Sequence, residues 1–539
     1  MCIRDSNRFD IAATVGWTGR YENMNNIRVS TNGGLVTENW FDLNASRYTP
    51  SSTLQRMELL KTGYMGTLSL GWDNYLFLEL TGRQERSSTL KDQSFFYPSA
   101  NLSFLFTQAF HMPSWWNYGK LRLSYGIVGN APETYTANIV YEQGSDNGFT
   151  WNTIPSSWGN ADIRPEKKYE YEIGLESKFL NNRLGIDVSY YNNRVKDQIL
   201  STPQPSTSGV KNVLMNVGEV ANHGWDISIS ATPILTRDFR WDLTANYGVY
   251  KNKVVKLADG VPYLEILNSG GSGIKIQAVE GQPMGDIYAQ VPQVNENGEY
   301  LVSDKGLYLN QTELQKVGNI NPAGVGGLFN SFSYKNVFLD FSIDFRIGGD
   351  VINEMNQYAT AVGLTPESLK YRDTEHGGLS YYYPGDNNSS GIPVQVDPST
   401  GVGPNGEIIY HDGIILPGVV ASTGERNTRI IPAGYYYNTT YNWGTEAEQL
   451  TYRHSVFDNS YVKLRELTIG YQFPEKMISK LGLGRLSVSV FGRNLFYFYK
   501  ALKNYDAESS VGTSWTNQAT VGSSTTATRS FGVSLRASF

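Results

Sequence analysis

Apolar and polar residues alternate with a period of two along much of this chain. The carboxyl-terminal segment is a clear example, since Phe531, Val533, Leu535, Ala537 and Phe539 alternate with glycine, serine and arginine. Because successive side chains of a strand point to opposite faces, this alternation puts one purely apolar row opposite a small or charged row. The segment is therefore predicted to be a strand with one face toward lipid and one toward water.

The same alternation recurs from one end of the chain to the other. We count about 14 to 16 such segments, each close to the roughly ten residues that a tilted strand needs to cross a bilayer. Asn181 and Asn182 separate two successive rows and predict a hairpin turn. The pattern predicts an all-β, antiparallel transmembrane barrel. Apolar rows fall at 9–17, 121–127, 169–175, 184–190, 225–229, 241–249, 341–347, 467–473 and 486–490.

Composition removes several other fold classes. The chain has 539 residues, of which 13% are aromatic and 18% are charged, and its mean hydropathy is -0.36. No window approaches the ~20 consecutive apolar residues of a spanning helix, which excludes a bundle of membrane helices. No linker or shift in composition divides the chain, so one large sheet is a simpler prediction than several soluble domains.

Charge and residue types leave little room for other chemistry. A net charge of -6 argues against a nucleic-acid partner, and a single cysteine, Cys2, excludes a disulfide framework. The five histidines are scattered without metal-ligand spacing, so no metal site and no cofactor is expected. Calcium bound by loop carboxylates such as Asp386, Asp397 and Asp412 is an alternative, but solvated turn residues are the preferred interpretation. No nucleophile elbow or nucleotide fingerprint is present, and we predict that the protein is not an enzyme.

The amino terminus lacks a charged region followed by an apolar stretch, so no secretory signal peptide is recognised in the sequence. Residues 1–6 match nothing that follows and are interpreted as a truncation scar or another non-native segment. The barrel is then expected to occupy residues 7–539.

A series of short segments shares both sequence and order with motifs of a known family. Residues 216–226 read NVGEVANHGWD, and residues 318–322 read GNINP. At three positions the series departs from these motifs: Glu85 and Asn319 stand where the motifs usually have Asp, and Asp226 stands where they usually have Glu. The series resembles the SusC/RagA family of TonB-dependent outer-membrane transporters. The other matching segments are 83–88, 97–99, 121–130, 460–471 and 492–495.

The resemblance implies a partial barrel. Family members close about 22 strands around a plugged lumen, so this chain would hold about two thirds of the strands. The signal peptide, TonB box and plug of relatives are not recognised in it. The implied location is the outer membrane of a Gram-negative bacterium, and the implied function is import of oligosaccharides or peptides. The implied partners are a SusD-like surface lipoprotein, the TonB complex acting through the plug region, and outer-membrane lipid. The alternative is a passive porin, a structural or adhesin-like barrel, or an outer-membrane hydrolase.

Three connections are too long for turns and are predicted to form the outer working surface, at about 131–166, 251–326 and 348–460. The longest is expected to help dock the lipoprotein. Aromatic rings in these connections suit stacking on sugars or peptides, but the alternative is that they pack against one another or form an interfacial girdle. The candidate ligand-binding residues are Trp151, Trp158, Tyr381, Tyr382, Tyr435, Tyr436 and Trp443.

The last strand has a separate predicted role. The resemblance to outer-membrane barrels implies that a final strand ending on an aromatic residue is read by the barrel-insertion machinery. The candidate assembly signal is Phe531, Val533, Leu535 and Phe539.

Overall fold

The computed structural model describes the chain in two compact units. The first unit comprises residues 1–225 and 252–261, and the second comprises residues 226–251 and 262–539. The described residues are all except 1, 6–7, 92–93, 147–148, 205, 270–272, 386–390, 443–450, 511, 513, 523–526 and 539.

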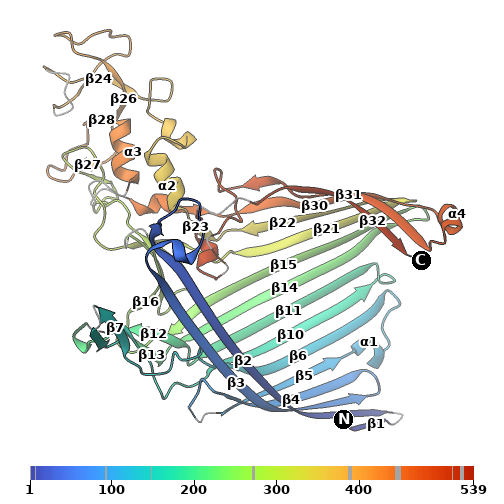
Figure 1. Cartoon of the computed structure of the whole chain (residues 1–539). Coiled ribbons are helices and arrows are strands. Elements are labelled where there is room, and N and C mark those ends of the chain that lie inside the picture. Colours follow the sequence, from blue (N-terminus) through green and yellow to red (C-terminus); the bar gives the residue numbers. More distant parts are fainter. Residues whose placement is uncertain are drawn as a thin grey trace. The chain divides into compact units, whose positions relative to one another are not determined.

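The first unit is built on an antiparallel meander in the order β1-β2-β3-β4-β5-β6-β10-β11 (Figure 1). β2 and β3 have 27 residues each, but β3 pairs with β4 only over residues 61–72. The strands are β1 (Cys2–Asp5), β2 (Phe9–Leu35), β3 (Ser46–Trp72), β4 (Leu76–Ser87), β5 (Ser94–Phe104), β6 (Trp116–Asn130), β10 (Glu166–Phe179) and β11 (Leu184–Lys196).

Shorter elements of the first unit lie in its connections. They are η1 (Leu43–Ala45), α1 (Phe106–Ala109), the hairpin of β7 (Glu142–Asp146) and β8 (Phe149–Thr153), η2 (Ser206–Ser208), and a small sheet of β9 (Ser157–Trp158), β12 (Ile199–Pro203) and β13 (Asn212–Asn216).

The second unit continues in the same manner, in the order β14-β15-β21-β22-β30-β31-β32. β14 belongs to this unit from residue 226 on, and β15 belongs to it up to residue 251. The strands are β14 (Glu219–Leu235), β15 (Phe239–Lys256), β21 (Gly324–Tyr334), β22 (Val337–Ile347), β30 (Tyr461–Gln472), β31 (Arg485–Lys500) and β32 (Ser530–Ser538).

The connections of the second unit contain many small elements. One sheet holds β16 (Tyr263–Ser269), β17 (Ile274–Val279), β18 (Asp286–Ala289) and β20 (Gln315–Asn319), and another holds β24 (Leu379–Tyr382), β25 (Val394–Gln395), β26 (Tyr410–Ile414) and β28 (Ile431–Pro432). Strand pairs are β19 (Leu301–Val302) with β27 (Val419–Val420), and β23 (Asp350–Ile352) with β29 (Val456–Asp458). The helices are α2 (Glu354–Ala361), α3 (Ala433–Tyr441), α4 (Glu475–Ile478), η4 (Pro366–Leu369), η5 (Tyr452–Ser455), η6 (Ser479–Leu481) and η7 (Asn517–Ala519).

The strand registers confirm the predicted apolar rows. Val533 lies opposite Val490, and Leu535 lies opposite Val488, so the row of β32 continues on β31. Val533 is 71% exposed and Leu535 is 68% exposed. Rows of exposed apolar side chains of this extent are unusual on a soluble monomer, but they are what a lipid-facing surface requires.

The two ends of the strands differ in their connections. Residues 73–75, 180–183 and 335–336 are tight turns, whereas the connections at the opposite strand ends, such as 131–165 and 348–460, are long. Outer-membrane barrels have short periplasmic turns and long outer loops. Within each unit, the strand ends with tight turns are therefore assigned to the periplasmic side and those with long connections to the outside. Aromatic pairs gather near the short turns, as expected for an interfacial girdle. They are Phe9 with Trp72, Trp115 with Phe179, and Trp241 with Phe332.

The hairpin predicted at Asn181 and Asn182 is confirmed, with both residues at positive φ. The main strands number 15 in the described residues, within the predicted range. Residues 2–5 form β1 and pair with residues 10–13, so most of the predicted non-native segment is placed on β2, while its origin stays a prediction. No helix in the described ranges is long and apolar enough to span a bilayer. The fold class is therefore all-β and antiparallel.

Candidate functional site

The connections of the second unit form an ordered outer assembly with its own core. Residues from β17, β18, β23 and η5 pack together and are almost fully buried, so these connections are not simple surface loops. The buried core residues are Ile274, Ile276, Ile287, Ala289, Ile320, Ile352, Tyr452, Val456 and Ala519. Two long connections, after β15 and after β22, are thus tied together by apolar packing within one unit.

Tyr381 belongs to a different buried cluster of the second unit, together with Tyr383 and Ile430. It is 1% exposed, and its ring stacks on Tyr410 and meets Tyr383 edge-on, each at 5.5 Å between ring centroids. Its hydroxyl donates a hydrogen bond of 3.1 Å to the Asp412 carboxylate. Burial, reinforced by that carboxylate, raises the pKa of the Tyr381 hydroxyl. Asp412, one of the weak calcium candidates, is therefore already a hydrogen-bond acceptor within the chain.

The second tyrosine cluster sits on α3. Tyr436 packs edge-on against Tyr437 and Tyr441, and burial raises its pKa. Tyr441 in turn stacks on His454 at 4.3 Å between ring centroids. Burial, together with the nearby Arg453 cation, lowers the pKa of the His454 imidazole to about 4. This histidine is therefore neutral at physiological pH and serves as a packing surface.

These placements favour the packing interpretation for Tyr381 and Tyr436. Trp151 in β8 and Tyr435 in α3 are exposed, and Trp158 and Tyr382 are partly buried, so their ligand-binding role stays a prediction. Trp443, Asp386 and the terminal Phe539 lie outside the described residues. The described residues contain no group of three or more His, Cys, Asp or Glu side chains placed to hold a metal ion.

Two of the family-like segments act as structural anchors. In the first unit, the Asn216 side chain accepts a bond from the Arg164 backbone N–H and donates to the carbonyls of Arg164 and Asp197, all within 3.0 Å. In the second unit, the Asn319 side chain donates to Asp286 at 2.7 Å and accepts from the Asn321 backbone N–H at 2.8 Å. Both asparagines hold connections against strand ends.

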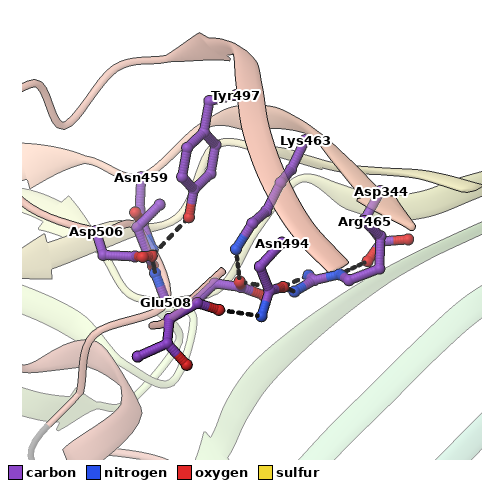
Figure 2. Close-up of polar contacts among 10 residues, drawn as sticks. Asp344, Asn459, Lys463, Arg465, Asn494, Tyr497, Asp506 and Glu508 are labelled. Carbon is purple, nitrogen blue, oxygen red and sulfur yellow. Dashed lines mark hydrogen bonds and ion pairs between the residues drawn. The ribbon is translucent and has the colours of Figure 1, made fainter. Parts of the chain in front are cut away.

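A polar cluster on β22, β30 and β31 stands out in the second unit (Figure 2). Asp344 lies between Ile343 and Phe345 and so points to the face opposite the apolar row, and its register partner is Lys463. Arg465 has no register partner on either neighbouring strand, because the pairing shifts between Leu464 and Glu466. Such a bulge re-aims the side chain, and here it turns Arg465 toward the polar face.

Both cations of this cluster bind one carboxylate. Arg465 donates from Nη1 to Glu508 Oε2 at 2.8 Å and from Nη2 to Glu508 Oε1, and Lys463 Nζ donates to Oε2 at 2.5 Å. Arg465 also donates to Asp344 at 2.5 Å and to Asn494 at 3.0 Å. Asn494 has a φ of 53°, a left-handed conformation that asparagine tolerates better than most residues. We call Asp344, Lys463, Arg465, Asn494 and Glu508 the wall cluster.

Because the wall cluster is partly buried, its charged side chains depend strongly on one another. The Lys463 side chain is 2% exposed, so its ammonium depends on Glu508 for compensation. Burial alone would raise the pKa of Glu508, but hydrogen bonds from Arg465 and Lys463 outweigh that effect and bring the pKa down to about 2. With two carboxylates, Asp344 and Glu508, facing two cations, the cluster is neutral.

Glu508 comes from the connection 501–529 between β31 and β32, which we call the last connection. Near Glu508 it is held by Tyr497, whose hydroxyl donates to Asp506 at 2.6 Å, and by Asn459, which donates to the Ala507 carbonyl at 2.9 Å. On the outer assembly, Asn504 donates to Asn356 of α2 at 3.0 Å. The last connection thus joins the strand wall to the outer assembly within the second unit.

Sequence reasoning missed the wall cluster, although a signal was present. Extending the apolar row of Leu467, Ile469 and Tyr471 backward puts Arg465 and Lys463 on the lipid face, where charges are costly. That conflict indicates a break in the alternation, which the structure reveals as the bulge. No sequence pattern pointed to Glu508, because its partners lie more than 40 residues away.

Curated relatives share this sequence over much of its length. The chain is 25% identical to TonB-dependent receptor P3 of Formosa agariphila over 83% of this chain and 42% of that protein. It is 30% identical to TonB-dependent receptor SusC of Bacteroides thetaiotaomicron over 42% of this chain and 24% of that protein. The chain spans less than half the length of the curated relatives it matches.

Solved structures share the fold. The structure of the RagAB peptide transporter matches with a TM-score of 0.65 and 18% identity, over 92% of this chain and 50% of that chain. A RagAB peptide importer in the 'open-open' state matches with a TM-score of 0.64. These matches agree with the resemblance to SusC and RagA seen in the sequence, and they show a shared fold of antiparallel strands. A family model described as "TonB dependent receptor-like, beta-barrel" covers residues 4–279, and the chain belongs to that family.

Proposed function

We propose that this chain is the barrel part of a SusC-like TonB-dependent transporter that imports oligosaccharides or peptides. In this proposal a SusD-like surface lipoprotein delivers the ligand, and the TonB complex acts through a plug region. Membership of the receptor family and similarity to SusC support it. The RagAB match supports the fold that such a transporter needs.

The observation that carries the proposal is the polar inner face of the strand wall. In the first unit, Arg122 on β6 forms ion pairs with Asp187 at 2.6 Å and Glu176 at 3.5 Å, on the face opposite the apolar row. In the second unit, the wall cluster occupies the same kind of face. A charged inner face beside an apolar outer face is typical of a barrel that carries polar material through its lumen.

Transport driven by TonB is separable from passive flow. Uptake of a labelled oligosaccharide or peptide mixture is measured in cells that carry or lack the gene, each with and without TonB. We expect uptake to need both, because the inner-membrane motor must pull on the plug region. Uptake that needs the gene but persists without TonB would identify a passive porin, and unchanged uptake without the gene would contradict a transport function.

The connection 348–460 is the proposed docking surface for the lipoprotein. It carries exposed apolar side chains, among them Leu364 at 78% and Val402 at 66% exposure, which a protein partner can cover. Because this connection also shares the core of the outer assembly, deleting it would disturb more than docking. Point substitutions are the sharper test.

Leu364→Glu and Val402→Glu are expected to weaken co-purification of the lipoprotein while the barrel still inserts. Ile154→Glu, on an exposed residue of a different connection, is the matched control and is expected to leave co-purification unchanged. If the lipoprotein remains bound in both variants, the docking surface lies elsewhere.

A further inference from the structure

The wall cluster has the form of a carboxylate-binding site. Arg465 presents two N–H groups to the two oxygens of one carboxylate, which is the bidentate geometry that guanidinium groups use for carboxylate recognition. Lys463 adds an ammonium to one of these oxygens, and Asn494 and Asp344 hold the guanidinium in place. The strand bulge at Arg465 is a backbone feature that serves this geometry.

The carboxylate that occupies this site is that of Glu508, a residue of the protein itself. Glu508 lies on the last connection, and its described neighbours from 501 to 510 form no helix or strand. The side chains of Glu508 and Arg465 are 29% and 31% exposed, so water and solutes reach the pair, whereas Lys463 is buried beneath it. The occupant can therefore leave while the cations stay fixed on β30.

When Glu508 leaves, the two cations lose a compensating negative charge, and this favours the binding of another anion. Without Glu508, the cations Lys463 and Arg465 face Asp344 as their sole carboxylate in the wall cluster, and a buried ammonium loses its partner. A buried charge left without a partner is strongly unfavourable. A second carboxylate in the same place restores the balance of charge and the bidentate bonds.

We propose that Lys463 and Arg465 form a binding site for a carboxylate-bearing ligand, which exchanges with Glu508 and so releases the last connection. The carboxylate comes from an acidic peptide or from a uronate-containing oligosaccharide, since both present the same planar group. Insofar as this ligand is the imported cargo, the inference rests on the proposed function. Binding and release themselves do not depend on transport.

Release has a structural consequence within the second unit. The residues next to Glu508 give up the bonds of Asp506 to Tyr497 and of Ala507 to Asn459 when the segment moves away. Asn504 connects the same segment to α2. An anion that binds on the inner wall thus also affects the contact of this segment with the outer assembly.

The test measures binding and release on the detergent-purified protein. The probes are a glycine–glutamate–glycine peptide with an acetylated amino end and an amidated carboxyl end, its glutamine analogue with the same blocked ends, and a galacturonate oligomer with its neutral galactose analogue. We expect an acidic probe, and not its neutral analogue, to bind and to speed hydrogen–deuterium exchange of residues 501–510. An effect of one acidic probe alone identifies the source of the carboxylate. Equal behaviour of acidic and neutral probes would overturn the proposal.

Variants separate the site from general loosening. Glu508→Gln removes the internal competitor, so we expect about tenfold or tighter binding of the acidic probe and fast exchange without any probe. Arg465→Lys keeps the charge but loses the bidentate bonds, and it is expected to weaken binding about tenfold. Glu265→Gln breaks an ion pair with Lys275 elsewhere in the second unit and serves as the matched control.

Heat-modified gel mobility checks that each variant still inserts as a folded barrel. Unchanged binding in both Glu508→Gln and Arg465→Lys refutes the site, even if transport is intact. Selective carboxylate binding in a protein that fails to import supports the site and counts against the proposed function. The two proposals therefore fail separately.

Discussion

Replacing Val533 by Arg should destabilise the protein far more than replacing Ser534 by Arg. Both residues lie on β32 and pair with β31, Val533 opposite Val490 and Ser534 opposite Ser489. The backbone bonds are thus alike in the two variants, and only the face differs. Val533 is 71% exposed and is surrounded by lipid in the membrane, whereas Ser534 faces the polar side.

The magnitude follows from the position of β32. An Arg on the lipid face near the bilayer midplane costs about 2–4 kcal/mol, which corresponds to a factor of about 30 to 1000 in the folding equilibrium. The same side chain on the polar face costs less than about 1 kcal/mol, as most solvent-facing substitutions do. The expected difference between the variants is therefore about 1 to 4 kcal/mol.

Urea titration of the protein in lipid vesicles, followed by gel mobility, measures both free energies of unfolding. Leu535→Arg is a second lipid-face variant and should behave like Val533→Arg, since it is 68% exposed on the same row. Equal losses on the two faces would refute the assignment of lipid and polar sides.

Three further predictions concern single contacts. Glu508 has a pKa of about 2 against an ordinary value of 4.5. The ionised side chain therefore stabilises the folded protein by about 2–3 kcal/mol above pH 4.5, and this stabilisation is lost as the pH falls toward 2. The urea midpoint of unfolding should fall less steeply over this pH range in Glu508→Gln than in the unchanged protein. Gly119→Ala should cost about 1–3 kcal/mol, because the new Cβ would lie 2.1 Å from the Phe106 ring. Gly66→Ala, with its nearest atom at 3.9 Å, should have a smaller effect in the same titration. Tyr381→Phe should lower thermal stability by about 1 kcal/mol through the lost hydroxyl bond, and a large loss of ligand binding at unchanged stability would contradict its packing role.

The strands could be predicted because their signal is local. A strand that separates lipid from water must alternate, and Val533, Ser534 and Leu535 show that alternation without any knowledge of their neighbours. The turn at Asn181 and Asn182 could be predicted for the same reason, since asparagine tolerates the positive φ that the turn needs. Such features depend on only a few successive residues.

The charges at Lys463 and Arg465 indicated a break in the alternation, but the wall cluster itself could not be predicted because it depends on distant partners. Arg465 turns to the polar face only through a bulge, and Glu508 reaches it from a connection that carries no alternation of its own. The ligand-binding role of the tyrosines stays a prediction for a related reason. A tyrosine-rich segment suits both ligand stacking and packing, and only the fold shows that Tyr381 is buried while Tyr435 is exposed.

The long hairpin of β2 and β3 means that the first unit does not unfold as one body. In the described residues, 25–35 and 46–56 pair with each other and with no other strand, over about 35 Å. A lone two-stranded ribbon is marginally stable in water, whereas strands inside a wide sheet share their hydrogen bonds with two neighbours. The outer part of the hairpin should therefore open and exchange its amide hydrogens at a free energy well below that of the wall. A single melting temperature then averages two separate events, and the early one leaves the membrane-embedded strands intact.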